Sequence, residues 1–209
     1  MKPPIPDRAA DPVGDAPLVN LPNALTVLRV LCVPLLAWLL WLDGGQLGPA
    51  RDAAAVVFVL ASITDFIDGA VARRYGLVTT FGKVADPIAD KALTGVALIG
   101  LSLLGELSWW ITGIILVREI GVTLLRFWII EHGVIPASRG GKAKTVMQTI
   151  AITMYLADVP LDWWPVASEI AMGLAVILTL VTGADYVVRA VRLRRQPIST
   201  QTRLGVHRG

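Results

Sequence analysis

The chain has 209 residues, of which 55% are hydrophobic and only 17% are charged. A soluble domain is rarely so apolar, and the long apolar blocks indicate a single polytopic membrane domain. The formal net charge of +3 is small, and we expect no nucleic-acid partner.

Cysteine and histidine chemistry is not expected to be central to this chain. Cys32 is the single cysteine and lies in an apolar run, so it cannot form an intrachain disulfide. His132 and His207 have no neighbouring Cys or His at ligand spacing, which argues against a zinc site.

The N-terminal end of the chain is rich in proline, a composition that cannot build a core. We expect a disordered cytoplasmic tail over residues 1–20, a six-helix transmembrane domain with the functional site over 21–194, and a basic cytoplasmic tail over 195–209. Because the first apolar stretch begins near Leu21 and is long enough to span, no cleaved signal peptide is expected.

Six apolar segments approach the roughly 20 residues that a helix needs to cross a bilayer. They are 22–42, 53–73, 86–104, 108–130, 144–159 and 165–188. The fifth is the shortest. The expected fold is therefore all-α, with six transmembrane helices.

Basic residues indicate the orientation of these spans, because Lys and Arg near span ends are retained in the cytoplasm. The loops of one side contain Arg51 as their single basic residue. The other side holds the tail arginines and Lys2, Arg8, Arg73, Arg74, Lys83, Arg139, Lys142 and Lys144. Both chain ends are therefore expected on the cytoplasmic side of the cell membrane.

Tryptophan prefers the membrane interface and supports this orientation. Trp128 is the exception to the pattern. The tryptophans at predicted external ends are Trp38, Trp41, Trp109, Trp110, Trp163 and Trp164.

Four aspartates lie near the cytoplasmic ends of the second and third spans: Asp65, Asp68, Asp86 and Asp90. Residues three or four apart share a helix face, so each pair lies on one face. If the faces meet, the carboxylates repel one another unless divalent cations neutralise them. Hard oxygen ligands favour Mg²⁺ or Mn²⁺, and two such ions could hold a diphosphate during displacement at phosphorus.

Small and basic residues accompany the aspartates. Gly69 and Ala72 lie on the face of the first pair and leave space for a bulky ligand, as Gly82 does ahead of the second pair. Arg73 adds positive charge suited to phosphate. Pro87 can sit in the first turn of a helix or kink one, and the sequence leaves both open.

Two other interpretations of the aspartates remain. They could be structural, paired with Arg73, Arg74 or Lys91, or they could be intramembrane carboxylates of a transporter. Four carboxylates with small residues at fixed offsets favour a metal–phosphate site, because burying several unneutralised charges is costly. The second half of the sequence shows no repeat of the pattern, as an inverted-repeat transporter would.

The complete pattern is D-x-x-D-G-x-x-A-R, eight residues, then G-x-x-x-D-x-x-x-D, and it resembles the signature of the CDP-alcohol phosphotransferases. It occupies Asp65, Asp68, Gly69, Ala72, Arg73, Gly82, Asp86 and Asp90. The resemblance implies a six-helix membrane fold, usually a homodimer, with a dinuclear metal site at the cytoplasmic interface.

The resemblance also implies roles and a reaction. Asp65, Asp68 and Asp86 would bind metal, and Asp90 would be both a ligand and the general base. An acceptor hydroxyl would attack the phosphorus that bears the lipid moiety of a CDP-linked lipid and release CMP, while a carboxylate takes the hydroxyl proton.

Further segments between about Pro22 and Gln148 resemble bacterial phosphatidylglycerophosphate synthases. The first is N-x-x-T-x-x-R at Asn23, Thr26 and Arg29. Asn23 could instead be an ordinary helix cap, whereas Arg29 lies deeper in the span. The residues expected to bind the CDP-lipid are Asn23, Thr26, Arg29, Gly69, Ala72, Arg73 and Gly82.

The other resembling segments are R-E-x-x-x-T-x-x-R from Arg118 and G-K-x-K-T-x-x-Q from Gly141. An acceptor that carries its own phosphate needs cations separate from the metal site. The candidate cations are Arg118, Arg139, Lys142 and Lys144. The loop cations could instead reflect topology alone, and Arg118 could pair with Glu119 or Glu131.

We therefore expect CDP-diacylglycerol and sn-glycerol 3-phosphate as substrates, with phosphatidylglycerophosphate and CMP as products. Inositol phosphate, serine and phosphatidylglycerol remain as alternative acceptors, and a metal-binding transporter or scaffold is the alternative without catalysis. Glu169 and Asp185 receive no role. The basic flank expected near anionic lipid head groups comprises Arg189, Arg192, Arg194 and Arg195.

Overall fold

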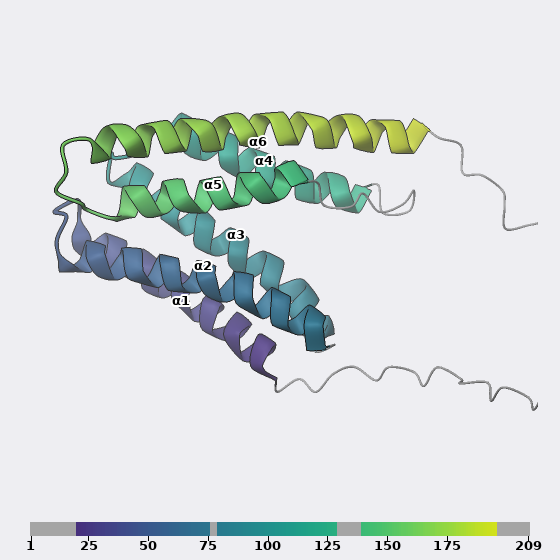
Figure 1. Ribbon diagram of the computed structural model, residues 1–209, viewed down its shortest axis with the longest axis horizontal. Coiled ribbons are helices and arrows are strands. Elements are labelled where there is room, and N and C mark those ends of the chain that lie inside the picture. The colour runs from purple at the N-terminus through teal and green to yellow at the C-terminus, as the bar shows by residue number, and fades with distance from the viewer. Residues whose placement is uncertain (1–19, 76–78, 129–138, 196–209) are drawn as a thin grey trace, which may run out of the picture. The chain divides into compact units, whose positions relative to one another are not determined.

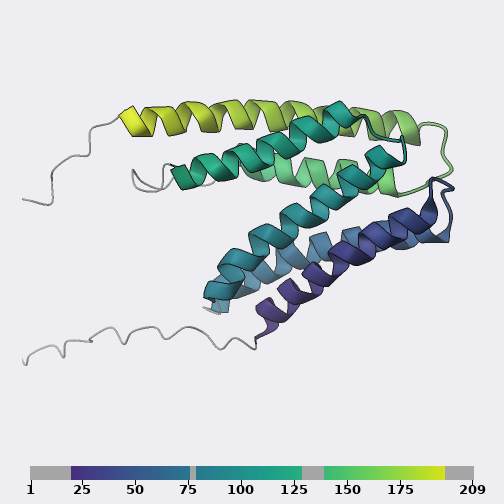
Figure 2. The same cartoon turned by 180° about the vertical axis from the view of Figure 1, so that it is seen from behind.

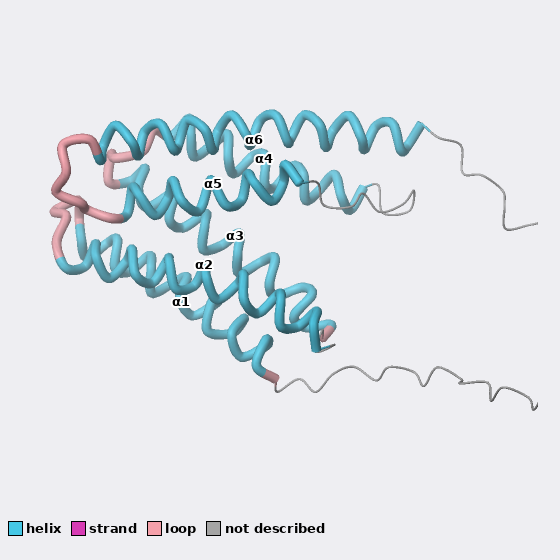
Figure 3. The backbone as a smooth tube through the Cα atoms, viewed as in Figure 1, coloured by secondary structure: helices cyan, strands magenta, loops and turns pink. Residues whose placement is uncertain are grey.

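The computed structural model describes residues 20–75, 79–128 and 139–195, with the backbone alone at 22, 66, 68–75, 80, 81, 83, 84, 127, 139 and 195. In these ranges it contains six helices and no strand (Figures 1 and 3). The helices are α1 (Leu21–Asp43), α2 (Pro49–Tyr75), α3 (Thr80–Leu103), α4 (Trp109–Trp128), α5 (Arg139–Leu156) and α6 (Trp164–Arg195). The expected all-α class is confirmed.

Contacts divide the chain into two units, Met1–Gly100 and Leu101–Gly209. The first unit contains α1, α2 and nearly all of α3, and the second contains α4, α5 and α6. The tails expected at the two ends fall almost wholly on residues 1–19 and 196–209, which lie outside the described residues.

Helix α1 begins and ends at residues with clear capping geometry. The Asn20 side chain accepts a hydrogen bond from the Asn23 backbone N–H at 2.8 Å. At the other end Gly44 adopts the left-handed conformation (φ 56°), which glycine tolerates, and its N–H donates to the Leu40 carbonyl at 3.3 Å. The cap is therefore Asn20, and the interpretation of Asn23 as the cap is wrong.

A buried ion pair closes the turn between α1 and α2. The Arg51 Nη2 and Nε atoms lie 2.7 and 3.1 Å from Asp43 Oδ2, and both side chains are 0% exposed. The carboxylate also accepts the backbone N–H groups of Gly45 and Gly48 at 3.0 and 3.3 Å. These partners satisfy a buried carboxylate that would otherwise be strongly destabilising.

The first unit packs around apolar side chains of α1 and α2. Leu36, Leu40, Ala54 and Phe58 are all almost completely buried. Gly100 of α3 lies against this core, because an added Cβ would be 2.5 Å from Leu40 Cδ1. The start of α1, the end of α2 and the start of α3 lie at the same end of this unit (Figures 1 and 2).

Helix α3 is longer at its start than the hydrophobic pattern predicts. It begins at Thr80, six residues before the expected start at Asp86. Pro87 therefore lies within α3, beyond the first turn, so the first-turn interpretation of this proline is wrong.

In the second unit, α6 packs along both α5 and α4. Ile152 and Leu156 of α5 and Met172 of α6 are fully buried. The indole N–H of Trp164, at the start of α6, donates to the carbonyls of Met154 and Ala157 at 3.1 and 3.0 Å. These bonds satisfy carbonyl groups near the end of α5 that lack helical partners.

Helix α6 extends beyond the predicted span and includes all four arginines of the basic flank. It continues to Arg195, and Arg189 pairs with Asp185 one turn earlier at 2.9 Å. The Arg194 guanidinium lies 3.9 Å from the ring centroid of Trp128, at the end of α4. The contact gives Trp128, the exception among the tryptophans, a cation–π partner.

Two helices are long and apolar enough to cross a membrane, over Asn23–Asp43 and Trp164–Arg194. The other four described helices do not meet this criterion of length and composition. All six nevertheless expose large apolar side chains: Leu31 (α1), Leu60 (α2), Leu103 (α3), Val117 (α4), Val146 (α5) and Val181 (α6) are more than half exposed. An apolar surface on every helix is what contact with lipid requires, and it agrees with a membrane protein.

Candidate functional site

A polar stripe of α1 faces the interior of the first unit. Asn23, Thr26 and Arg29 follow one another at three-residue spacing and are 5%, 1% and 1% exposed. That spacing keeps successive residues near one face of the helix. The sequence identified all three residues as binding candidates, and the structure shows that they contact α2 and α3.

Asn23 contacts the residue that caps α3. Thr79 Oγ1 donates a hydrogen bond to Asn23 Oδ1 at 2.8 Å and accepts the Gly82 backbone N–H at 3.0 Å. Thr79 is therefore the N-cap of α3 and also links α3 to α1. Thr79 was not among the residues identified from the sequence, although a threonine just before a helical segment is a recognisable capping signal.

Arg29 brings carboxylates of two helices together. Its Nη1 atom lies 2.7 Å from Asp65 Oδ1 of α2 and 3.7 Å from Asp86 Oδ1 of α3. Thr26 donates a short hydrogen bond to the same oxygen of Asp86. We call Thr26, Arg29, Asp65 and Asp86 the Arg29 cluster. The predicted meeting of the two aspartate faces is observed for this pair, and their observed ion-pair partner is Arg29.

Gly82 lies where a side chain would disturb this arrangement. An added Cβ would be 3.1 Å from Asn23 Oδ1, 3.3 Å from Thr79 Oγ1 and 3.7 Å from Asp86 Oδ2. Contacts of 3.1 and 3.3 Å are tighter than most Cβ contacts. Space for a ligand at Gly82 stays a prediction, and the structure shows the polar side chains of Asn23 and Thr79 beside this glycine.

The remaining predicted residues of this site are placed by their helices. Asp90 lies one turn after Asp86 on α3 and is half-buried. The backbone positions of Asp68, Gly69, Ala72 and Arg73 lie on α2, and their side chains are outside those described.

The donor set is suited to a hard divalent cation, because Asp65 and Asp86 offer carboxylate oxygens near the same point and are 39% and 40% exposed. Among the described residues no group of three or more His, Cys, Asp or Glu forms a metal-binding cluster. Asp68, one of the four predicted ligands, is outside that set. The structure thus brings together two carboxylates of the expected four.

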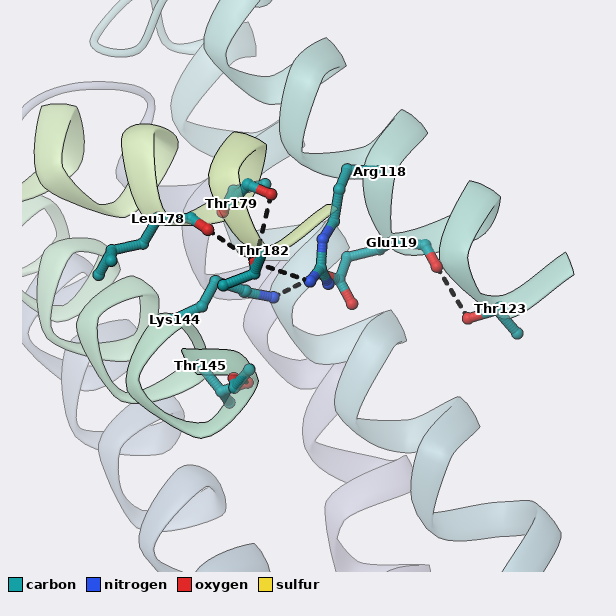
Figure 4. A network of polar contacts seen from close by, with 9 residues as sticks. Arg118, Glu119, Thr123, Lys144, Thr145, Leu178, Thr179 and Thr182 are labelled. Atoms are coloured by element: carbon teal, nitrogen blue, oxygen red, sulfur yellow. Dashed lines mark hydrogen bonds and ion pairs between the residues drawn. The ribbon is translucent and has the colours of Figure 1, made fainter. Parts of the chain in front are cut away.

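A second polar cluster lies in the second unit (Figure 4). Arg118 Nη1 of α4 lies 2.8 Å from Glu119 Oε1, and the Lys144 ammonium of α5 makes a short ion pair with the same oxygen. Arg118 Nη2 donates to Thr182 Oγ1 of α6 at 3.0 Å. We call Arg118, Glu119, Lys144 and Thr182 the Glu119 cluster. It joins three helices through one carboxylate and one guanidinium.

This cluster resolves the partner of Arg118. The sequence left Glu119 and Glu131 as candidates; Glu119 makes the contact, and Glu131 lies outside the described residues. Of the other predicted cations, Lys142 is exposed, Lys144 is buried and the Arg139 side chain is not described. Thr182 was not identified from the sequence, since it lies 64 positions after Arg118.

Most of the chain is similar to known proteins. Residues 19–181 match the model of the family described as CDP-alcohol phosphatidyltransferase. A probable phosphatidylglycerophosphate synthase of Mycobacterium tuberculosis H37Rv is 50% identical over 181 residues, covering 86% of this chain and 85% of the relative.

Proteins named CDP-diacylglycerol–glycerol-3-phosphate 3-phosphatidyltransferase are also similar. That of Rickettsia typhi is 39% identical over 171 residues, covering 80% of this chain and 94% of the relative. That of Bacillus subtilis is 37% identical over 182 residues, covering 81% and 94%.

Proposed function

Because the chain belongs to the CDP-alcohol phosphatidyltransferase family, we propose that it transfers the phosphatidyl group of CDP-diacylglycerol to sn-glycerol 3-phosphate. The products are phosphatidylglycerophosphate and CMP. The names of the relatives describe this reaction, and each relative matches this chain over most of its length. The structural observation that supports it best is the meeting of Asp65 and Asp86 at Arg29.

Two Mg²⁺ ions, or Mn²⁺ in their place, are the proposed cofactors. Asp65, Asp68, Asp86 and Asp90 would hold them, and the two half-exposed carboxylates of the Arg29 cluster suit hard cations. When bound, such ions neutralise diphosphate charge and stabilise displacement at phosphorus. Arg29 contributes by keeping carboxylates of α2 and α3 close together despite their repulsion.

Asp90 is the proposed general base. It lies one turn from Asp86 and is half-buried. Its carboxylate would take the proton from the acceptor hydroxyl as the acceptor oxygen bonds to the phosphorus of the phosphatidyl group. The bond between that phosphorus and the oxygen of CMP breaks in the same displacement.

The CDP-lipid would be held beside this cluster. The proposed set is Asn23, Thr26, Arg29, Gly69, Ala72, Arg73 and Gly82. The close approach of Gly82 to Asn23 brings members of the set on α3 and α1 together. Backbone that carries no side chain lets a bulky ligand come near the helix.

The phosphate of the acceptor would bind to cations of the second unit. The proposed set is Arg118, Arg139, Lys142 and Lys144. Arg118 and Lys144 both pair with the carboxylate of Glu119, so the Glu119 cluster brings two cations and one carboxylate together. Such a pair of cations favours a phosphate over an uncharged acceptor.

The membrane arrangement is part of the proposal. Six spans with both termini and the active site on the cytoplasmic side of the cell membrane are supported by the basic-residue pattern and by the apolar side chains exposed on all six helices. Membrane lipids and a second copy of the chain are the expected partners. Light scattering of the purified protein tests the homodimer.

An acceptor panel tests the reaction. Purified protein would be incubated with CDP-diacylglycerol, Mg²⁺ and one acceptor at a time, with CMP release and the lipid product measured. We expect product with sn-glycerol 3-phosphate and none with glycerol, the matched acceptor without phosphate. Product with inositol phosphate, serine or phosphatidylglycerol alone would overturn the proposed acceptor. No CMP release with any acceptor would favour a transporter or scaffold.

A further inference from the structure

Two consecutive residues of α6 contact the side chain of Arg118. Thr182 accepts a hydrogen bond from Arg118 Nη2 at 3.0 Å (Figure 4). At Gly183 an added Cβ would lie 3.2 Å from Arg118 Cγ and 3.6 Å from Nε. Arg118 therefore passes close to the bare backbone of α6, and its guanidinium meets the hydroxyl one residue earlier.

Other helical glycines of the second unit show that this contact is specific to Gly183. At Gly113 and Gly121 of α4 and at Gly173 of α6, an added Cβ would meet nothing within 4 Å. Glycine disfavours a helix interior, and its presence there often has a packing reason. At Gly183 that reason is the space taken by the Arg118 side chain.

The direction of the Thr182 hydroxyl is set by α6 itself. Its Oγ1 donates to the Leu178 carbonyl at 2.6 Å and lies 3.3 Å from the Thr179 carbonyl. With its proton directed to α6, the oxygen presents a lone pair to Arg118. The guanidinium is thus held from two sides, by Thr182 at Nη2 and by Glu119 at Nη1.

A guanidinium binds phosphate through a planar fork of N–H groups, and this geometry depends on its orientation. Two of the five N–H donors of Arg118 are used by Thr182 and Glu119. The Nε atom is buried beside Gly183, so the donors that remain for an anion are the second N–H groups of Nη1 and Nη2. A fixed side chain with donors remaining is suited to an anion.

We propose that Thr182 and Gly183 are positioning residues for the acceptor phosphate, which they orient through Arg118. This inference rests on the role of Arg118 in the proposed function. It gives α6, to which the sequence assigned no role in the reaction, a part in acceptor recognition.

The main test compares Gly183→Ala with Gly173→Ala, the same change on the same helix where there is open space. Initial rates of CMP release would be measured while each substrate is varied in turn. We expect Gly183→Ala to raise the KM for sn-glycerol 3-phosphate roughly tenfold, because displacing Arg118 weakens a charge-assisted contact. The KM for CDP-diacylglycerol and kcat should change little, and Gly173→Ala should resemble the wild type.

Variants of Thr182 provide a second test that adds no volume. Thr182→Val removes the acceptor oxygen and should raise the same KM by about threefold to tenfold. Thr182→Ser keeps the hydroxyl and should restore it. If Gly183→Ala does not fold, the comparison of Thr182→Val with Thr182→Ser tests the inference by itself. Equal KM values for acceptor in Thr182→Val and Thr182→Ser would then overturn the inference, as would equal values in the two glycine variants.

Arg118→Gln separates this inference from the proposed function. A raised KM for sn-glycerol 3-phosphate in Arg118→Gln, with no change in the α6 variants, would reject positioning by Thr182 and Gly183 alone. An unchanged KM in Arg118→Gln would reject the acceptor role of Arg118 itself. The absence of CMP release from the wild-type protein would reject the proposed phosphatidyl transfer itself.

Discussion

The Arg29 cluster and the Glu119 cluster have opposite charge patterns. In the first, a guanidinium that is 1% exposed lies between carboxylates that are 39% and 40% exposed. In the second, a carboxylate that is 19% exposed pairs with an arginine and a lysine that are 15% and 4% exposed. The first cluster contains two carboxylates and one guanidinium, and the second contains two cations and one carboxylate.

This difference corresponds to the ligands proposed for the two clusters. Carboxylates that remain partly exposed are available to cations, whereas fixed cations are available to a phosphate. In each case a single residue of opposite charge holds like charges from different helices together. Because the Glu119 cluster is more buried, loss of its central residue should destabilise the protein more.

The largest effect should come from Asp90, the proposed general base, which lies one turn after Asp86 of the Arg29 cluster. Asp90→Asn removes the proton acceptor and should lower the rate of CMP release by roughly 10²- to 10⁴-fold. Glu169→Gln, a similar change at an exposed residue of α6, should leave the rate near that of wild type. CMP release by Asp90→Asn at the wild-type rate would contradict the proposed role of Asp90 as the general base.

The next effect concerns the centre of the Glu119 cluster. Glu119→Gln leaves two largely buried cations without their carboxylate and should lower the free energy of unfolding by about 3 kcal/mol. Thermal unfolding in detergent measures this. Inorganic phosphate should raise the melting temperature of Glu119→Gln more than that of wild type, and the absence of any extra increase would argue against an anion site.

The smallest effect should follow removal of the cation from the Arg29 cluster. Arg29→Gln should lower the stability of metal-free protein by about 1 kcal/mol, because both carboxylates are partly exposed and screened.

Mg²⁺ should raise the melting temperature of Arg29→Gln more than that of wild type, since the ion would replace the lost positive charge. Arg126→Gln, at an exposed arginine of α4, is the matched control. Equal Mg²⁺ responses in all three proteins would count against metal binding at Asp65 and Asp86.

Local patterns in the sequence predicted the all-α fold and the approach of Asp65 to Asp86. The first helix was expected over 22–42 and occupies Leu21–Asp43. The approach of Asp65 to Asp86 could be predicted because helix periodicity places each aspartate pair on one helix face, and the two faces were assumed to meet. Hydropathy alone ended the last span at 188, because the following arginines are polar, whereas ion pairing and the contact with Trp128 accompany a helix that continues to Arg195.

Contacts between distant residues could not be predicted in this way. Thr79 meets Asn23 across 56 positions, and Thr182 meets Arg118 across 64. Neither partner is specified by helical periodicity, which describes only neighbours within a few turns. Gly183 likewise resembles any other glycine in a helix until the side chain that passes beside it is known.

The ion pair at the turn between α1 and α2 has a consequence for the opposite end of that hairpin. Fourteen positions separate Arg29 from Asp43 on α1, and fourteen separate Arg51 from Asp65 on α2. The two pairs have reversed polarity, with the arginine on α1 in one and on α2 in the other. Sliding one helix by a single turn, about 5.4 Å, would break both pairs at once. A shift of one turn therefore costs two ion pairs, and the position of Asp65 along α1 is tied to a turn about 21 Å away.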